Sequence, residues 1–401
     1  MCRYPVSTPA DIKRRLEQNW MQYLIANSEK LSMDTLDGAS PPSVFVGRYG
    51  YPNVRIGPMI PPAHGDTAIM DRTEMWVGKS LEEIAGFRLS LVRGVASVNA
   101  RDVRGRYVES LQELAMSDKP AESEATFEKK PLADTDLERE LRLNTESAPF
   151  GPAAPIKTFK ASSLSADQRI ESAFYDGDLK ASDAVVDLYK KGVDSGSIHK
   201  VLSVGMLGLK KNRKLVPTRW SITAADDMIS SRLARENEAS ANSSIDLFEV
   251  RQYSHLGNYY SVVMMPDSVW SFEMIESWYA GDGMMAVGAD YEDARGLDHY
   301  PSIAGAYFSA RLAVAEYLSR RRRMASVLVL REIHPEYVMP VGVWQIREGV
   351  REVMKTPART FDGIDEALTF ACSTMSQSRS DILAHSRLYR ILRSQTRITN
   401  Y

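Results

Sequence analysis

Cysteine is nearly absent from this sequence: Cys2 and Cys372 are the only two in 401 residues. Two distant thiols form neither a disulfide framework nor a four-cysteine zinc site. The six histidines are scattered, and none has a histidine or cysteine neighbour at metal-ligand spacing. We therefore expect no metal site of this kind. Because free thiols are typical of a reducing compartment, we expect a cytoplasmic protein.

Long apolar runs and an excess of one charge are missing too. No 18 consecutive residues are apolar, so we expect no membrane span. The first 18 residues are rich in charge and lack the apolar core of a signal peptide. Lysine and arginine number 50 against 52 acidic residues. The whole chain is therefore not attracted to nucleic acid, and any such binding must come from local basic patches.

The common motifs of nucleotide-binding and hydrolytic enzymes are also absent. The sequence contains no G-x-x-x-x-G-K-[ST], no G-x-G-x-x-G, no G-x-S-x-G and no H-E-x-x-H. No reaction is therefore identified by a motif, and the sequence leaves open whether the protein is an enzyme.

Apolar periodicity predicts an α+β or mixed α/β protein, with several helices packed on mixed sheets. The clearest helices are 9–31, 302–324 and 344–354, and shorter patterns predict a helix at 270–278 and a strand at 201–209. A charged, Pro- and Gly-containing segment suggests a flexible linker or insert. We place this segment at 117–155. It separates an N-terminal region (1–116) from a main region (156–376), which is followed by a basic helical tail (377–401).

The stretch 210–223 carries five cations beside an apolar segment and a single tryptophan, Trp220. We interpret it as a strand that ends in a helix capped by Thr223, with Asp226 three residues later. Cations at the N-terminus of a helix suit an anionic ligand such as phosphate. The alternative is a solvated basic turn between two core elements.

Two further segments add cations. Residues 43–58 predict a glycine-rich hairpin. Its Tyr49 and Tyr51 could stack on a base or sugar. The alternative is a hairpin whose glycines serve the turns alone. Four consecutive arginines lie in the last turn of the predicted helix 302–324. This is more positive charge than is needed to complement the helix dipole. The candidate phosphate or nucleic-acid ligands are Arg48, Arg55, Lys211, Arg213, Lys214, Arg219, Arg320, Arg321, Arg322 and Arg323.

Acidic residues near these cations offer a second interpretation. Asp226, Asp227 and Glu332 are candidates for holding Mg²⁺ in phosphodiester chemistry, because that ion prefers carboxylate oxygens. The protein would then be a metal-dependent nuclease or a nucleotide-processing enzyme that uses 211–219 as a phosphate clamp. Solvated surface acids are the alternative.

Four segments resemble the archaeal Nre family: 44–54 (VFVGRYGYPNV), 111–120 (LQELAMSDKP), 213–223 (RKLVPTRWSIT) and 341–348 (VGVWQIRE). The resemblance covers nearly the whole chain in the right order. It implies a role in DNA repair and recruitment by the sliding clamp PCNA through a C-terminal peptide. Some relatives carry a cysteine-rich, zinc-finger-like element near the N-terminus; only Cys2 is present here, so a zinc function is not carried over.

The clamp-binding peptide of that family reads Q-x-x-h-x-x-a-a, with h aliphatic and a aromatic. Gln395, Ile398 and Tyr401 match positions one, four and seven, and position eight is not in the sequence. Because one aromatic contact is missing, we expect weaker binding to PCNA than the full motif would give. The alternative is the frayed end of a basic helix.

Overall fold

The computed structural model describes residues 8–132, 150–279 and 284–394. The chain forms two compact units: the first comprises residues 1–228 with 338–342, and the second 229–337 with 343–401. The boundary lies inside helix α8 (Thr218–Ala239). In the described ranges no helix is both long and apolar enough to cross a membrane.

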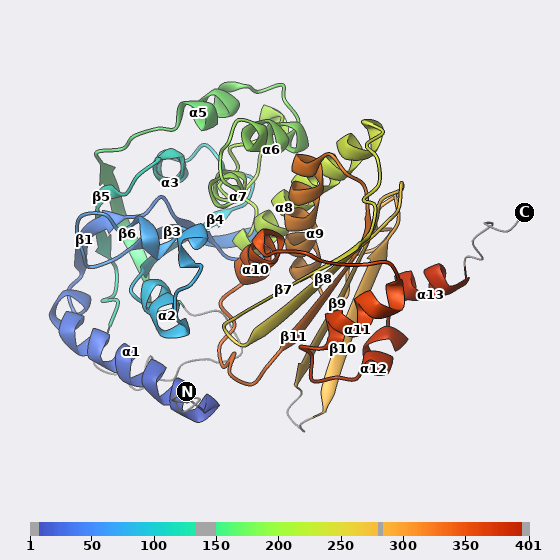
Figure 1. Cartoon of the computed structure of the whole chain (residues 1–401). Coiled ribbons are helices and arrows are strands. Elements are labelled where there is room, and N and C mark those ends of the chain that lie inside the picture. Colours follow the sequence, from blue (N-terminus) through green and yellow to red (C-terminus); the bar gives the residue numbers. More distant parts are fainter. Residues whose placement is uncertain (1–7, 133–149, 280–283, 395–401) are drawn as a thin grey trace, which may run out of the picture. The chain divides into compact units, whose positions relative to one another are not determined.

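The first unit is built on a mixed six-stranded sheet in the order β1-β5-β6-β4-β3-β2 (Figure 1). Strands β4 and β6 are parallel, and the other neighbours are antiparallel. Helix α3 packs on β6 and β2, and α7, α6 and α5 follow it in successive contacts. The strands are β1 (Thr35–Ser40), β2 (Val44–Val46), β3 (Asn53–Ile60), β4 (Val92–Asn99), β5 (Ala121–Phe127) and β6 (Ala153–Ser162). The helices are α1 (Pro9–Leu31), α2 (Leu81–Leu89), α3 (Arg106–Met116), α5 (Gln168–Tyr175), α6 (Ala181–Lys190) and α7 (Ser195–Ser203).

Local capping explains where two of these helices begin. The Thr8 side chain accepts from the backbone N–H of Asp11, and the Asp11 carboxylate accepts from Thr8, so α1 starts at Pro9 as predicted. Ser80 and Glu83 form the same reciprocal pair at the start of α2. Two orphan N–H groups are satisfied at each helix start, and the predicted start of the helix 9–31 is confirmed.

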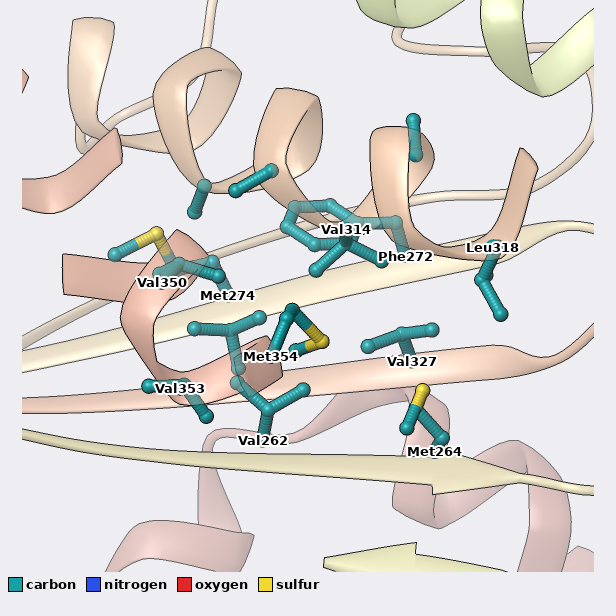
Figure 2. Packing of buried hydrophobic residues seen from close by; sticks show 14 of the residues in the cluster. Val262, Met264, Phe272, Met274, Val314, Leu318, Val327, Val350, Val353 and Met354 are labelled. Carbon is teal, nitrogen blue, oxygen red and sulfur yellow. The ribbon is translucent and has the colours of Figure 1, made fainter. Parts of the chain in front are cut away.

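The second unit also has a mixed six-stranded sheet, in the order β10-β9-β11-β8-β7-β12. Alternate residues of its central strands point to opposite faces, and each face is covered by helices. Figure 2 shows one face, where Val262, Met274 and Val327 pack against Val314 of α9 and Val350 of α10. On the other face Val263 and Leu328 pack against α11, α12 and α13. The elements are β7 (Phe248–His255), β8 (Asn258–Met265), β9 (Ser271–Tyr279), β10 (Met285–Glu292), α9 (Gly305–Arg321), β11 (Ser326–Ile333), α10 (Trp344–Lys355), β12 (Arg359–Phe361), α11 (Ile364–Cys372), α12 (Arg379–Ala384) and α13 (Arg387–Ser394).

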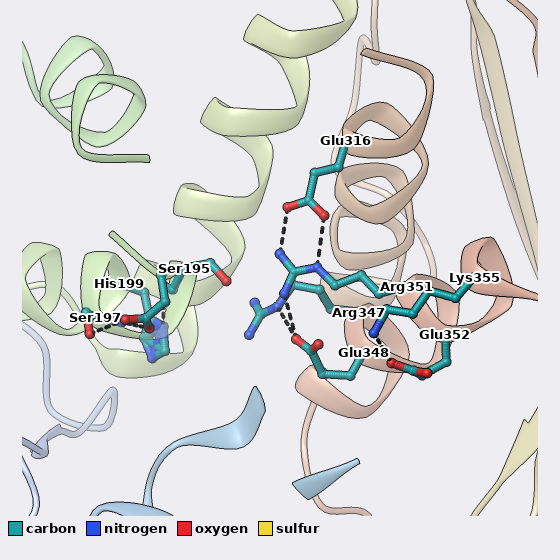
Figure 3. Close-up of polar contacts among 10 residues, drawn as sticks. Ser195, Ser197, His199, Glu316, Arg347, Glu348, Arg351, Glu352 and Lys355 are labelled. Carbon is teal, nitrogen blue, oxygen red and sulfur yellow. Dashed lines mark hydrogen bonds and ion pairs between the residues drawn. The ribbon is translucent and has the colours of Figure 1, made fainter. Parts of the chain in front are cut away.

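Ion pairs join the helices of this unit to each other and to the sheet. Arg351 of α10 contacts both carboxylate oxygens of Glu316 on α9, at 2.6 and 2.9 Å, and Glu348 at 2.8 Å (Figure 3). Arg311 of α9 contacts the buried Glu292 of β10 at 2.6 Å. These buried charges are paired, as their desolvation requires.

The predicted fold class is confirmed, but some local predictions are wrong. Residues 271–279 form strand β9 rather than a helix, because they lie between β10 and β11 and their apolar side chains alternate between the two faces. Residues 195–203 are helix α7, so the strand predicted at 201–209 is absent. Periods of 2 and 3.6 residues are hard to separate over such short segments.

The division into units also differs from the predicted regions. The segment 117–155, expected as a flexible linker or insert, contains β5, which pairs with β1 on one side and β6 on the other. Its acidic residues Glu122 and Glu124 are exposed and alternate with buried Ala121, Ser123 and Ala125. The acidic composition therefore reflects the exposed face of a strand. Residues 133–149 lie outside the described ranges.

The close approach of β3 to β4 at Gly57 can be tested by substitution. A Cβ atom added at Gly57 would lie 1.4 Å from the carbonyl oxygen of Gly94, so Gly57→Ala forces the backbones apart. We expect a loss of at least about 3 kcal/mol in the free energy of unfolding, measured in urea. Gly86→Ala in α2 is the matched control, because no atom lies within 4 Å of its added Cβ. We expect it to be neutral or stabilising by up to about 1 kcal/mol; equal effects of the two changes would contradict this packing.

Candidate nucleic-acid interface

The loop between β2 and β3 presents two tyrosines and an arginine to solvent. The backbone N–H of Gly47 donates to the carbonyl of Arg55 at 2.7 Å, and that of Asn53 donates to Gly50 at 2.8 Å. Gly50 has φ +79°, a left-handed conformation that suits glycine. The hairpin predicted at 43–58 is therefore confirmed, and Arg48, Tyr49 and Tyr51 lie at its tip.

The basic stretch differs in form from the prediction. It begins with a short 3₁₀ turn, η3 (Lys210–Asn212), and α8 starts at Thr218 rather than after Thr223. The Thr223 hydroxyl donates back to the Arg219 carbonyl at 3.2 Å, inside the helix. The N–H groups of Trp220 and Ser221 both donate to Pro217, whose fixed φ favours a helix start. Arg219 and Trp220 therefore lie in the first turn of α8.

Hydrogen bonds bring the hairpin, the β4–α3 loop and the basic stretch together. The N–H of Ala100 donates to the Pro52 carbonyl, and the N–H of Leu215 donates to the Ala100 carbonyl, both at 2.7 Å. The N–H of Val46 donates to the Thr218 hydroxyl at 2.9 Å. Three segments far apart in the sequence thus form one part of the first unit.

We use the name basic–aromatic surface for a set of exposed cations and aromatic rings on these three segments. Arg55 is exposed on β3 of the same hairpin, next to the residues at its tip. Among the residues that the structure describes, no carboxylate lies within ion-pair distance of any of the cations in this surface. The surface comprises Arg48, Tyr49, Tyr51, Arg55, Arg101, Arg104, Lys211, Lys214, Arg219 and Trp220.

Arg101 and Arg104 were missed by the sequence analysis. Both are exposed in the loop between β4 and α3. Asp102 of this loop is also exposed, and its carboxylate would lie 3.2 Å from a Cβ atom at Gly105, just before that helix. The sequence does not predict that this loop lies beside 210–223. The two segments are joined by a hydrogen bond to the backbone carbonyl of Ala100, which any residue could provide.

Arg213 belongs to the basic stretch but serves the fold. It donates to the carbonyls of Gly208 at 2.8 Å and Asp176 at 3.0 Å, and its guanidinium lies over the ring of Phe174. Burial lowers the pKa of Arg213, against an opposing effect of Asp176. We therefore leave Arg213 out of the basic–aromatic surface.

The four arginines 320–323 lie in the second unit, and three of them have partners there. Arg321 contacts Glu249 at 2.6 Å, and Arg323 contacts Asp246 at 3.8 Å and the Ser244 carbonyl at 2.8 Å. Arg320 donates to the Glu316 carbonyl at 3.2 Å. Arg322 is exposed and ends α9 in a left-handed conformation. This run secures the end of α9, and we do not group it with the cations of the first unit.

The acidic candidates are placed differently from what a metal site needs. Glu332 is fully buried in the second unit, where it accepts from the N–H groups of Ser376 and Gln377 and contacts His334. Asp226 is buried on α8, and Asp227 follows it. In the described ranges no three or more His, Cys, Asp or Glu residues are grouped to hold a metal ion. Among the described residues Asp226, Asp227 and Glu332 therefore belong to no such group, and the magnesium-dependent alternative stays a prediction.

A hollow of about 260 Å³ lies in the second unit, and its lining contains none of the predicted site residues. Its lining mixes both charge signs, and Arg295 there is paired with Asp293 at 2.6 Å. Unlike the basic–aromatic surface, this hollow has more acidic than basic residues in its lining.

The predicted clamp-binding residues Gln395, Ile398 and Tyr401 lie outside the described residues. The helix before them, α13, is anchored by Glu273 of β9, a buried carboxylate that accepts from the Ser386 hydroxyl and from the N–H groups of Arg387 and Leu388. A carboxylate at a helix N-terminus is stabilising. The described part of the tail is thus attached to the second sheet.

Both parts of the chain match models of one protein family. Residues 17–282 match the family described as "Archaeal Nre, N-terminal", and residues 292–401 match "Archaeal Nre, C-terminal". The chain belongs to the archaeal Nre family. The predicted resemblance is therefore confirmed.

Curated Nre relatives cover most of the chain. One is the DNA repair protein NreB of Archaeoglobus fulgidus, 40% identical over 339 residues, which are 83% of this chain and 83% of the relative. DNA repair protein NreA of the same organism is 36% identical over 357 residues, 87% of this chain and 88% of the relative. DNA repair protein NreA of Haloferax volcanii is 32% identical over 375 residues, 90% and 88% of the two chains. No solved structure matches.

In this Nre protein, two of the segments that carried the resemblance lie at the basic–aromatic surface. Residues 44–54 supply Arg48, Tyr49 and Tyr51, and residues 213–223 supply Lys214, Arg219 and Trp220. The hydrogen bond from Val46 to Thr218 joins the two segments directly. The surface is thus formed from parts of the chain by which the family is recognised.

Proposed function

We propose that this Nre protein acts in DNA repair, that it binds DNA through the basic–aromatic surface, and that its last seven residues bind the sliding clamp PCNA. The names of the curated relatives support the repair role. The observation that carries DNA binding is that hydrogen bonds join three segments with exposed cations, and that no carboxylate among the described residues pairs with these cations. Since the chain as a whole is nearly neutral, a local surface of one charge is what phosphate binding requires.

Free cations matter because a guanidinium or ammonium group that already holds a carboxylate gains little from a phosphate. Lys211, Lys214 and Arg219 are exposed, and no described carboxylate pairs with them. Each would release condensed counterions from DNA on binding, and affinity should fall steeply with salt. The first turn of α8 adds the positive end of a helix dipole next to Arg219.

Recruitment by PCNA rests on the pattern Gln395, Ile398 and Tyr401. In the motif that these residues resemble, positions four and seven fill an apolar pocket and the glutamine hydrogen-bonds beside it. A single 3₁₀ turn brings positions spaced by three onto one face. The described residues just before this peptide form α13, which Glu273 anchors to β9.

Lys211→Ala combined with Lys214→Ala tests DNA binding. Each phosphate contact contributes about 0.7–0.9 to the slope of log affinity against log salt, so we expect the slope to fall by roughly 1.5. At about 0.15 M salt this corresponds to a roughly 20-fold loss of affinity. The measurement is fluorescence anisotropy of a labelled oligonucleotide from low to high salt.

The control for this experiment is Lys157→Ala with Lys160→Ala. Both lysines are exposed on β6 of the same unit and lie outside the basic–aromatic surface. The control removes the same net charge, so it measures the effect of overall charge alone. Equal slopes and equal losses in the two double variants would refute the assignment of the surface.

A further inference from the structure

Aromatic side chains are unusually exposed at the basic–aromatic surface. Tyr49 is 80% exposed, Trp220 is 47% exposed and Tyr51 is 40% exposed. The rings of Tyr51 and Trp220 lie 5.6 Å apart at an angle of 52°. Large apolar rings are normally buried. Three exposed rings on segments whose exposed cations have no carboxylate partner among the described residues point to a ligand with flat apolar faces and negative charge.

These rings are held by the fold rather than carried on a free loop. The chain before Arg48 is bonded to α8 through Val46 and Thr218, and the chain after Tyr51 is bonded to Ala100 through Pro52. Tyr49 is also contacted by Arg48, whose guanidinium lies 4.9 Å from the ring centre and donates to its hydroxyl at 3.0 Å. A preorganised ring loses little conformational entropy when it binds.

We propose that the basic–aromatic surface binds single-stranded or locally unpaired DNA, with bases stacking on Tyr49 and on the Tyr51–Trp220 pair. This inference rests on the proposed DNA binding and names its substrate class. In a duplex the faces of the bases are stacked on one another, so an exposed ring reaches a base face only where the strand is unpaired. The cations around the rings then contact the phosphates of the same strand.

The surface offers little for reading a particular sequence. Asn53 and Asn99 carry amides of the kind that recognise base edges, but these two side chains are hydrogen-bonded to each other at 3.1 Å. The Asn99 oxygen also accepts from the N–H of Arg101 at 3.0 Å. Stacking is tolerant of sequence because every base has a π face. We therefore expect binding with weak sequence preference.

The test compares one labelled oligonucleotide, single-stranded and annealed to its complement, with full-length wild-type protein, Tyr49→Ala and Trp220→Ala. Stacking contributes about 1–3 kcal/mol per base, so each variant should bind the single strand about 5- to 150-fold more weakly. Duplex binding should change much less, and wild-type protein should prefer the single strand. Tyr49→Phe and Trp220→Phe keep a ring and should restore most of the affinity.

Thermal unfolding of each variant shows whether it is folded, and the Phe variants separate stacking from a structural role of the side chain. If the alanine variants bind the single strand as wild-type protein does, or if both DNA forms weaken equally, the stacking inference is wrong while phosphate binding stands. If wild-type protein binds neither form, the proposed DNA binding fails and this inference fails with it.

Discussion

Removal of residues 395–401 should abolish binding of this Nre protein to PCNA in a calorimetric titration. The deletion removes Gln395, Ile398 and Tyr401 together, so we expect affinity to fall by more than about 100-fold. Tyr401→Ala alone removes one buried ring, worth about 1.5–3 kcal/mol, and should weaken binding about tenfold or more. DNA binding by the same truncated protein should be unchanged.

Arg393→Ala is the matched control for the tail. Arg393 is exposed near the end of α13, 3.7 Å from Asp365, and lies just before the proposed peptide. It should alter PCNA binding by less than about twofold, as expected for an exposed ion pair. Undiminished affinity after removal of 395–401 would show that another surface makes the contact.

Asp71→Asn should destabilise the first unit by about 3–5 kcal/mol, measured by urea unfolding. Asp71 holds Arg88 of α2 at 2.9 Å and Lys200 of α7 at 2.6 Å, and all three side chains are largely buried. The amide keeps the shape of the carboxylate but removes the negative charge that contacts both buried cations. Asp178→Asn is the control: Asp178 is exposed in the same unit, and its loss should cost less than about 0.5 kcal/mol.

The same aspartate should give the first unit an acid-sensitive component of stability. Burial acts to raise the pKa of Asp71, but Lys200 and Arg88 outweigh it and hold the pKa below its ordinary value of 3.8. A carboxyl group whose pKa is depressed by folding stabilises above its unfolded pKa and loses that contribution as the pH falls through the folded value. Stability should therefore decline below about pH 4 in wild-type protein and less so in Asp71→Asn. Parallel acid profiles would contradict the ion-pair assignment.

The sequence predicted those elements whose signals are local. Helix α1 follows from Thr8 and Asp11, and the β2–β3 hairpin from its glycines and β-rich flanks. Strand β9 was missed because its apolar residues at 270, 274 and 278 also fit a helical spacing. The segment forms a strand because it pairs with β10 and β11. The pairing with β11 joins segments that are distant in the sequence.

The candidate site was predicted only in part, for the same reason. Lys211, Lys214 and Arg219 were chosen because cations cluster in the sequence, and Arg48 because it lies in the glycine-rich hairpin. All four are exposed in one unit without carboxylate partners among the described residues. Arg213 belongs to the same run of cations, but its guanidinium donates hydrogen bonds to backbone carbonyls of the first unit. Arg101 stands apart in sequence and joins the surface through the backbone of Ala100. Composition identifies cations, but it does not reveal which of them are already bound.

The central claim is that separate segments of the first unit form one surface that receives an unpaired DNA strand. Photo-cross-linking of a single strand containing halogenated uracil, followed by peptide mapping, tests it most directly, because cross-links form where a ring stacks on a base. We predict cross-links in 44–60 and 214–228, at Tyr49, Tyr51 and Trp220. Cross-links confined to the second unit, such as the segment around Arg320–Arg323, would contradict the claim.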